Sequence, residues 1–169
     1  MKINKKIERI FGESQTSFFG FDSFSGFGKL NNEDQHPIFK DGLFEVNKKK
    51  IIKNIEKNSK GQNFKIVEGF FEDIMPNKNI NEFGVNKLRI VLIDCDTKKA
   101  AKLALDFIKN SIQDGTIIMF DDYVFYKGRY DMGEYSAFEE FKKENKKFFF
   151  RRIFDYGYGS KAFIACINR

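Results

Sequence analysis

The sequence predicts an α/β fold with a mostly parallel β-sheet that ends in an antiparallel hairpin. Apolar runs of strand length alternate with segments whose apolar residues recur at helical spacing, which is the pattern of strand–helix–strand units. The last two apolar runs are joined by Gly-Tyr-Gly-Ser, a composition typical of a hairpin turn. With 169 residues the chain is long enough for a proper hydrophobic core, so we expect a single domain over residues 1–169.

Short elements are expected in the first half of the chain. Isoleucines at helical spacing predict a helix over residues 2–11, and SFFGFD (17–22) has the composition of a strand that ends at an acid. Ile51, Ile52 and Ile55 share one side of a second helical pattern. The elements expected in order are helix 2–11, strand 17–22, helix 46–58, strand 64–69 and a short turn or helix over 70–76.

The second half repeats strand and helix before the hairpin. KLRIVLID (87–94) is almost continuously apolar, which favours a strand buried on both faces. The next segment has a clear apolar stripe, and Thr97 is a suitable N-cap for that helix. The elements expected in order are strand 87–94, helix 97–112, strand 115–122, helix 135–145 and the hairpin strands 147–156 and 161–167.

Cysteine usage and the terminal segment indicate a reducing compartment. Cys95 and Cys166 are far apart and no CxxC spacing occurs, which argues against a disulfide framework and a zinc site. The first residues lack the apolar stretch of a signal peptide, and no apolar run approaches the ~18 residues of a membrane span. We therefore predict a cytoplasmic protein with no membrane partner.

The net charge of +6 raises the possibility of a nucleic-acid partner. However, the lysines are spread over almost every polar segment instead of forming one basic face. Asn, Ile and Phe are also abundant while Pro and Trp are scarce, a bias expected from an AT-rich genome. This distribution favours an ordinary solvated surface, and we predict no nucleic-acid partner.

Acidic residues gather at the predicted carboxyl ends of three strands. Asp22, Asp94, Asp121 and Asp122 each follow such a strand, and ligands bind at this edge of open α/β sheets. A single acid after a strand is commonly a helix cap or a turn residue, but three strands that end in this way favour a functional cluster. Crowded carboxylates repel one another unless a cation offsets their charge, and Mg²⁺ prefers oxygen ligands. The sequence therefore predicts a Mg²⁺ site at this edge.

Four motifs occur in the order and spacing of a known family. They are FGFDSFSGF (19–27), VEGFFEDIMP (67–76), LIDCD (92–96) and IIMFDDY (117–123). Together they resemble the macrocin-type O-methyltransferases over residues 17–169. The resemblance implies a Rossmann-like class I methyltransferase fold and transfer of a methyl group from S-adenosylmethionine, with Mg²⁺, to a hydroxyl of a sugar-like small molecule.

The resemblance implies a cofactor site built from two loops. Asp22 would lie near the ribose, whose hydroxyls a carboxylate can accept, and Ser23 and Phe24 would line the same loop. Residues after the third strand of the family fold would border the adenine, although phenylalanines there are equally compatible with an ordinary core. These residues are Gly69, Phe70 and Phe71.

The resemblance also implies a metal site and candidate catalytic groups. Asp94, Asp121 and Asp122 would ligate Mg²⁺. Asp96, the second acid of the family's D-x-D motif, would position the acceptor or assist its deprotonation, and Asp94 would contribute to catalysis through the metal. His36 is a further catalytic candidate because histidine titrates near neutral pH, or else an ordinary loop residue. Any acceptor contacts in the segment after IIMFDD would come from Tyr123, Tyr126 and Tyr130.

The chain departs from the family pattern at its start. Residues 1–16 resemble the end of the first helix, and no strand with a glycine-containing loop precedes them. The first strand of the family fold lies centrally, so its loss predicts a gap in the sheet. Its neighbours would close up, or a partner chain or second copy would fill the gap, or the chain would be a gene fragment; we favour a fragment or truncated homologue.

Two other functional classes are compatible with parts of the sequence. A decayed or partner-completed domain without catalysis would keep the fold but not a full cofactor site. Metal-dependent glycosyltransferases and phosphatases of the haloacid dehalogenase type also use D-x-D motifs. The phosphatase motif needs Thr or Val where this chain has Lys98, and it is expected much nearer the start of the chain. The glycosyltransferases do not explain the FDDY strand end or the terminal hairpin. We therefore favour the methyltransferase interpretation. It includes an inactive form, because the first cofactor-binding motif is missing.

Overall fold

The strands form two separate sheets in the computed structural model, which describes residues 16–59 and 62–168. Strands β1 (Ser17–Asp22) and β2 (Asn63–Glu68) pair in parallel. The second sheet has the order β3-β4-β6-β5, with β3 parallel to β4 and β6 antiparallel to both of its neighbours. Its strands are β3 (Ile90–Ile93), β4 (Ile117–Phe120), β5 (Phe148–Tyr156) and β6 (Ser160–Ile167).

Helices follow the strands in the order that the sequence predicts. They are α2 (Lys48–Asn58), α3 (Phe71–Ile74), α4 (Lys98–Ile108) and α5 (Gly133–Glu144), with single 3-10 turns at Asn32–Asp34 and Ile80–Phe83. Thr97 caps α4, as predicted, by accepting a hydrogen bond from the Ala100 N–H. β3 and β4 are shorter than the predicted runs 87–94 and 115–122, because the flanking residues of those runs lie in loops. The helix predicted over residues 2–11 lies outside the described residues.

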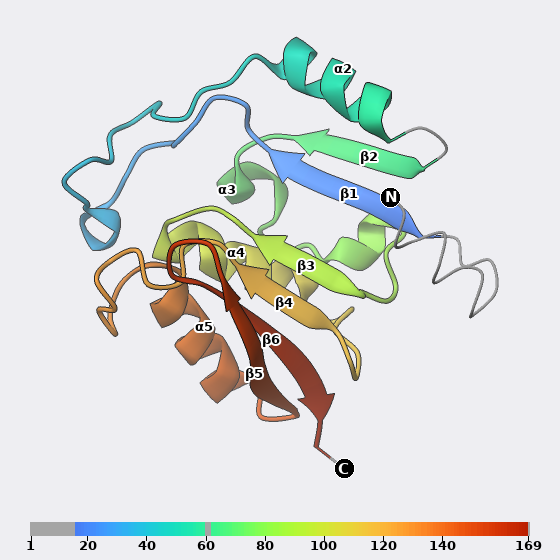
Figure 1. Cartoon of the computed structure of the whole chain (residues 1–169), viewed down its shortest axis with the longest axis vertical. Coiled ribbons are helices and arrows are strands. Elements are labelled where there is room, and N and C mark those ends of the chain that lie inside the picture. The colour runs from blue at the N-terminus through green and yellow to red at the C-terminus, as the bar shows by residue number, and fades with distance from the viewer. Residues whose placement is uncertain (1–15, 60–61, 169) are drawn as a thin grey trace.

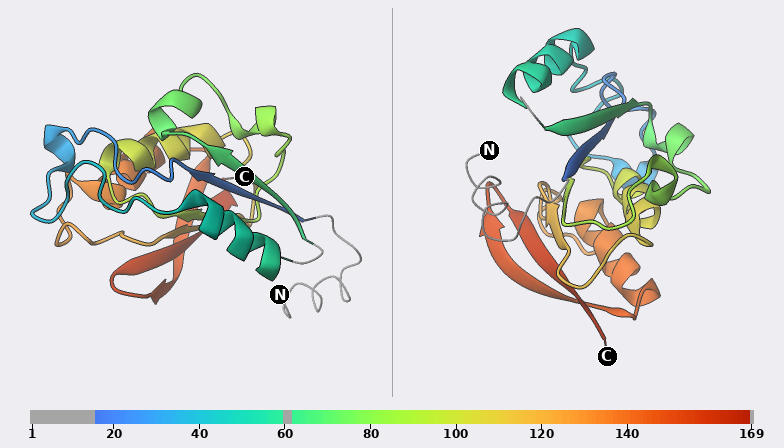
Figure 2. Two further views of the ribbon diagram at one scale, coloured as in Figure 1. Left: turned by 90° about the horizontal axis from the view of Figure 1, so that it is seen from above. Right: turned by 90° about the vertical axis from the view of Figure 1, so that its right-hand side faces the viewer.

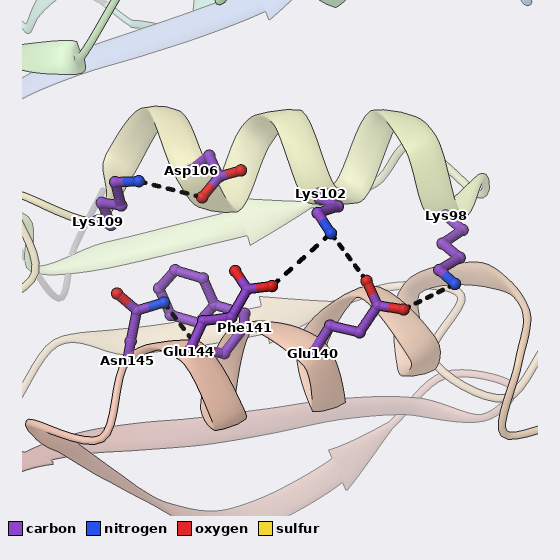
Figure 3. A network of polar contacts seen from close by, with 8 residues as sticks. All are labelled: Lys98, Lys102, Asp106, Lys109, Glu140, Phe141, Glu144 and Asn145. Carbon is purple, nitrogen blue, oxygen red and sulfur yellow. Dashed lines mark hydrogen bonds and ion pairs between the residues drawn. The ribbon is translucent and has the colours of Figure 1, made fainter.

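The core lies between the four-stranded sheet and helices α4 and α5, which cover one of its faces (Figures 1 and 2). Its fully buried side chains are Leu105, Phe107, Ile118, Phe120 and Phe138. Figure 3 shows that the exposed sides of the two helices are joined by Lys98 and Lys102, whose ammonium groups lie 2.8 and 2.9 Å from the Glu140 carboxylate. Exposed ion pairs contribute little to stability, so the aromatic and aliphatic contacts hold α4 and α5 to the sheet.

The gap predicted in the middle of the sheet is present, because β1 pairs only with β2 and β3 pairs only with β4 among the described residues. The expectation that the segment 87–94 is buried on both faces was wrong: Ile90 and Leu92 are 63% and 57% exposed. The reason is that α4 covers one face of β3, while no described element covers the opposite face or its free edge.

The described helices include none that is both long enough and apolar enough to cross a membrane. The described thiols of Cys95 and Cys166 are both free.

Truncation of Phe138 tests the packing of α5 on the sheet. Its ring is fully buried and lies 4.7 Å from Phe120 and 4.9 Å from Phe163, measured between centroids. We expect Phe138→Ala to lower the free energy of unfolding in urea by about 3–5 kcal/mol because it leaves a cavity. Phe149→Ala is the control, since that ring is 53% exposed and its loss is expected to cost about 1 kcal/mol or less. Equal losses would contradict this account of the core.

Candidate active site at the carboxyl ends of the strands

Three aspartates converge where β3 and β4 end. Asp94 follows β3, and Asp121 and Asp122 follow β4. One carboxylate oxygen from each lies within 4.8 Å of the other two. The parallel register, which places Ile93 opposite Phe120, brings both strand ends to the same edge. Three carboxylate oxygens at this separation fit a hard divalent cation such as Mg²⁺.

Burial and mutual repulsion perturb the acids of this edge. Burial raises the pKa of Asp94 above its ordinary value, and the charges of Asp121 and Asp22 add to the effect. The pKa of Asp122 is raised by burial and then by Asp121 and Asp94. Burial, followed by Asp122 and Asp94, raises the pKa of Asp96 to about 7. A bound cation would offset this repulsion, so the electrostatics agree with the geometry of the donor set.

A buried hydroxyl beside the acids has no protein partner. Tyr156 Oη is buried, and no hydrogen-bond partner is found for it among the described residues. Burial, then the charges of Asp121 and Glu134, raise its pKa to about 12. Buried polar groups in folded proteins normally have a partner. A water or other polar group carried with a metal ion would supply one, which further supports the fit of a hydrated cation here.

Glu134 joins the two loops that carry the aspartates. Its side chain is fully buried, and its two oxygens accept hydrogen bonds from the Cys95 N–H at 3.2 Å and the Asp122 N–H at 3.0 Å. Burial raises its pKa to about 8 despite these two amides, which favour the carboxylate. The sequence interpretation missed Glu134, because this residue ends the segment between the predicted strand 115–122 and the predicted helix 135–145, where no apolar periodicity marks a buried position.

Ser160, at the start of β6, supports the same loops from the other side. Its hydroxyl donates to the backbone oxygen of Asp121 at 2.5 Å and lies 3.4 Å from the Asp121 carboxylate. The residue is buried and belongs to the hairpin that follows α5. The sequence contained only the turn signal GYGS, so its contact with Asp121 was not predicted.

A cavity of about 170 Å³ lies beside the metal-site candidates. It brings together four of the predicted cofactor residues, Asp22, Ser23, Phe70 and Phe71, with Asp94 and Asp96. Asp22 Oδ1 accepts a hydrogen bond from the Phe24 N–H at 2.6 Å, which orders the loop after β1. Asp34, which the sequence interpretation did not single out, also lines the cavity and accepts from the Lys98 N–H at 2.8 Å.

Two of the predicted cofactor residues do not line this cavity. Phe24 is 7% exposed and packs beneath its loop with a φ of 57°. Gly69 has a φ of 150°, and an added Cβ would lie 2.5 Å from Ile74 Cγ2. Glycine at this position therefore allows the chain to pack closely against α3, and it does not enlarge the cavity.

His36 lies in an aromatic cluster outside the cavity lining. Its ring centroid is 4.7 Å from that of Phe39, 4.8 Å from Phe125 and 5.3 Å from Tyr126. The Tyr126 hydroxyl donates to the Asp34 backbone oxygen at 3.2 Å, so this cluster holds the loop of residue 36 against the segment after β4.

Tyr123 and Tyr130, the other two predicted acceptor contacts in the segment after β4, differ in their burial. Tyr123 is buried, with its ring 5.3 Å from that of Phe163, whereas Tyr130 is 81% exposed. Neither lines the cavity. An acceptor role for them stays a prediction.

The raised pKa of Asp96 predicts a pH-dependent stability of the metal-free protein. The pKa of an aspartate in the unfolded chain is about 4, whereas the pKa of Asp96 in the folded chain is about 7. The folded state therefore binds this proton more tightly than the unfolded state does. The stability that this difference contributes to the folded state is fully present below about pH 4 and is lost as the pH rises through about 7. We expect the melting temperature in EDTA to fall from pH 5 to pH 8.

Asp96→Asn should make that fall smaller, because asparagine stays neutral and tolerates the left-handed φ of 59° at this position. The raised pKa of Glu134 accounts for part of the fall that is left. Asp106→Asn on α4, outside the cavity lining, is the matched control and should keep the wild-type slope. An unchanged slope in Asp96→Asn would contradict the assignment.

Comparisons with known proteins agree with this architecture. The O-methyltransferase NovP superposes with a TM-score of 0.71 at 14% identity, over 97% of this chain and 66% of the NovP chain. CalS11, a calicheamicin methyltransferase, superposes with a TM-score of 0.61 at 19% identity, over 86% of this chain and 59% of its own. The chain thus spans about two thirds or less of the length of these solved structures. A search of the curated proteins finds no significant match.

The sequence model of the macrocin O-methyltransferase (TylF) family matches residues 5–148, well over half of the chain. The likeness to NovP and CalS11 shows that the fold is that of an O-methyltransferase. The chain therefore belongs to the macrocin O-methyltransferase (TylF) family.

Proposed function

We propose that this domain binds S-adenosylmethionine and Mg²⁺ and transfers a methyl group to a hydroxyl of a sugar-like small molecule. The observation that carries the proposal is the convergence of Asp94, Asp121 and Asp122 beside a cavity that contains Asp22, in a member of this family. CalS11, which shares the fold, is a TDP-rhamnose 3'-O-methyltransferase, which supports a sugar-like acceptor.

The cofactor would lie in the cavity between the loop after β1 and the start of α4. Bound S-adenosylmethionine supplies an electrophilic methyl group. One oxygen of Asp22 accepts from the Phe24 N–H, which leaves the other free to accept from ribose hydroxyls. Phe70 and Phe71 line the same cavity and offer aromatic surface to the adenine. These residues orient the cofactor and contribute no proton to the reaction.

Mg²⁺ would be held by Asp94, Asp121 and Asp122. When bound, a divalent cation lowers the pKa of a coordinated hydroxyl. Asp96 lines the cavity, so its carboxylate is placed to accept the acceptor's hydroxyl proton. Glu134 and Ser160 hold the loops of these acids in place.

His36 supports the loop that borders the cavity. Its ring stacks against Phe39 and Phe125, and its Nδ1 lies 3.4 Å from the Ile38 N–H. These contacts favour a positioning role over the direct proton transfer that the sequence suggested. The assignment predicts that His36→Phe keeps the aromatic contacts and most of the function.

A second candidate is a domain that needs a partner before it binds the cofactor. The specific observation is that β1 and β3, whose carboxyl ends flank the cavity, belong to separate sheets. The chain also spans 66% of NovP, so the activity of the longer protein is a proposal for this domain. Cofactor titration of the chain alone separates the two candidates.

Calorimetric titration with S-adenosylhomocysteine tests the cofactor site. We expect micromolar binding that Asp22→Ala weakens at least roughly tenfold, because hydrogen bonds to a charged group are lost. Asp106→Ala, on α4 and outside the cavity lining, should bind like the wild type. No binding by a cooperatively folded wild-type chain would rule out the self-sufficient form and leave the partner-dependent one.

Thermal unfolding with and without Mg²⁺ tests the metal site. At pH 8 without metal, we expect Asp122→Asn to raise the melting temperature by roughly 2–4 °C, because it removes one of several crowded charges. Saturating Mg²⁺ should raise the melting temperature of the wild type and not that of Asp122→Asn. An equal rise in both proteins would show that the ion binds elsewhere.

A further inference from the structure

We propose that Tyr158, at the tip of the turn between β5 and β6, is a stacking platform for the sugar ring of the methyl acceptor. The turn consists of residues 157–159 and lies at the end to which the arrows of β3 and β4 point (Figure 1). It therefore shares the edge of the sheet that carries Asp94, Asp121 and Asp122. That the sugar is the methyl acceptor rests on the proposed function, whereas binding of a sugar at the turn does not.

Ser160 ties this turn to the candidate metal ligands. Its hydroxyl donates to the backbone oxygen of Asp121 and lies 3.4 Å from the Asp121 carboxylate. Tyr158 is two residues before Ser160, and two residues span at most about 7 Å of chain. The ring of Tyr158 is therefore within reach of a small molecule that is bound at the aspartates.

Two glycines fix the path of the turn. Gly157 and Gly159 have φ values of 53° and 86°, in the left-handed region that glycine adopts without strain. A Cβ added at Gly159 would clash with the side chain of Val124, so the turn packs directly on the segment after β4. A Cβ added at Gly157 would lie 2.8 Å from Ser160 Oγ. The backbone on both sides of Tyr158 is therefore held against the loops that carry the acids.

The side chain of Tyr158 itself is free, with a relative exposure of 103%. Hairpin turns are ordinarily made by Gly, Asn, Asp and Ser, and Gly157, Gly159 and Ser160 already supply that chemistry. The turn therefore does not need an aromatic residue at its tip. A free aromatic face on a fixed backbone is suited to ligand binding, because little conformational freedom is lost when a ligand stacks on it.

The chemistry around the turn favours an uncharged sugar ring over a phosphate. The face of an aromatic ring carries partial negative charge, which attracts the polarised C–H groups on one face of a sugar. The nearest cations along the two flanking strands are Lys161 and Arg152. Their side-chain nitrogens lie 3.1 and 3.6 Å from the Asp155 carboxylate, so both cations are already ion-paired. The carboxylates at the same edge can accept hydrogen bonds from sugar hydroxyls.

The turn and the cavity proposed for the cofactor lie on different sides of the acids. Asp94 lines that cavity, whereas Asp121, Asp122 and the residues of the turn do not. Asp121 is instead the aspartate that contacts Ser160. This arrangement suits methyl transfer, because the acceptor oxygen approaches the methyl group from the side opposite the sulfur of the cofactor.

The variant Tyr158→Trp tests the proposal directly, because the chain contains no tryptophan. The probe is methyl α-L-rhamnopyranoside, chosen because CalS11 acts on TDP-rhamnose. In saturating Mg²⁺ and S-adenosylhomocysteine, we expect a saturable change in tryptophan emission in the millimolar range, since a stacked sugar shields the ring from water. Phe149→Trp is the control: it lies on β5 outside the turn, at a position that is 53% exposed, and should show no saturable change.

Two further variants separate stacking from hydrogen bonding. Tyr158→Phe keeps the aromatic face, whereas Tyr158→Ala removes it, and neither disturbs the core because the side chain is fully exposed. We expect Tyr158→Ala to weaken rhamnoside binding, measured by ligand-observed NMR, at least roughly fivefold, and Tyr158→Phe to stay within roughly twofold of the wild type. Phe149→Ala, which removes an exposed ring elsewhere on β5, should bind like the wild type. S-adenosylhomocysteine should bind Tyr158→Ala and the wild type equally.

Three outcomes would overturn the proposal. They are no saturable emission change in folded Tyr158→Trp, equal rhamnoside binding by Tyr158→Ala and the wild type, and a saturable change with thymidine diphosphate but none with the rhamnoside. The last outcome would assign the turn to a nucleotide. Sugar binding at the turn of a chain that does not bind S-adenosylhomocysteine would contradict the proposed function and leave the sugar site standing. Binding of S-adenosylhomocysteine without any response to the sugar would do the reverse, so the two failures are distinguishable.

Discussion

The site depends on one buried carboxylate. Glu134 accepts hydrogen bonds from the Cys95 and Asp122 N–H groups, and it therefore fixes the distance between the loops after β3 and β4. Those loops carry Asp94, Asp121 and Asp122, whose charges repel one another. Without such a bridge, repulsion would drive the loops apart in the absence of a cation. The start of α5 thus holds the three aspartates of the proposed metal site together without being one of its proposed ligands.

The rest of the architecture supports this arrangement from both sides. Aromatic packing of Phe138 against Phe120 and Phe163 holds α5, and with it Glu134, on the four-stranded sheet. On the other side, Asp34 accepts from the Lys98 N–H at the start of α4 and lines the cavity. The helices therefore do more than cover the sheet, because their amino ends order the loops in which the acids lie.

The separation of the strands into two sheets determines how the two sides of the candidate active site are connected. β1 ends at Asp22 and Asp94 directly follows β3, yet no described backbone hydrogen bond joins these strands. The distance between Asp22 and Asp94 is therefore set by loops and side chains.

The sequence by itself determined the order of helices and strands, the Thr97 cap and the position of Asp22, Asp94, Asp121 and Asp122 at strand ends. These features follow from local periodicity and capping chemistry, which neighbouring residues specify. Only the tertiary structure decided that β1 and β3 stay apart, that Ile90 and Leu92 are exposed, and that Glu134 is buried between two loops. Each of these depends on contacts between residues far apart in the chain, because the environment of a side chain is set by what packs across from it.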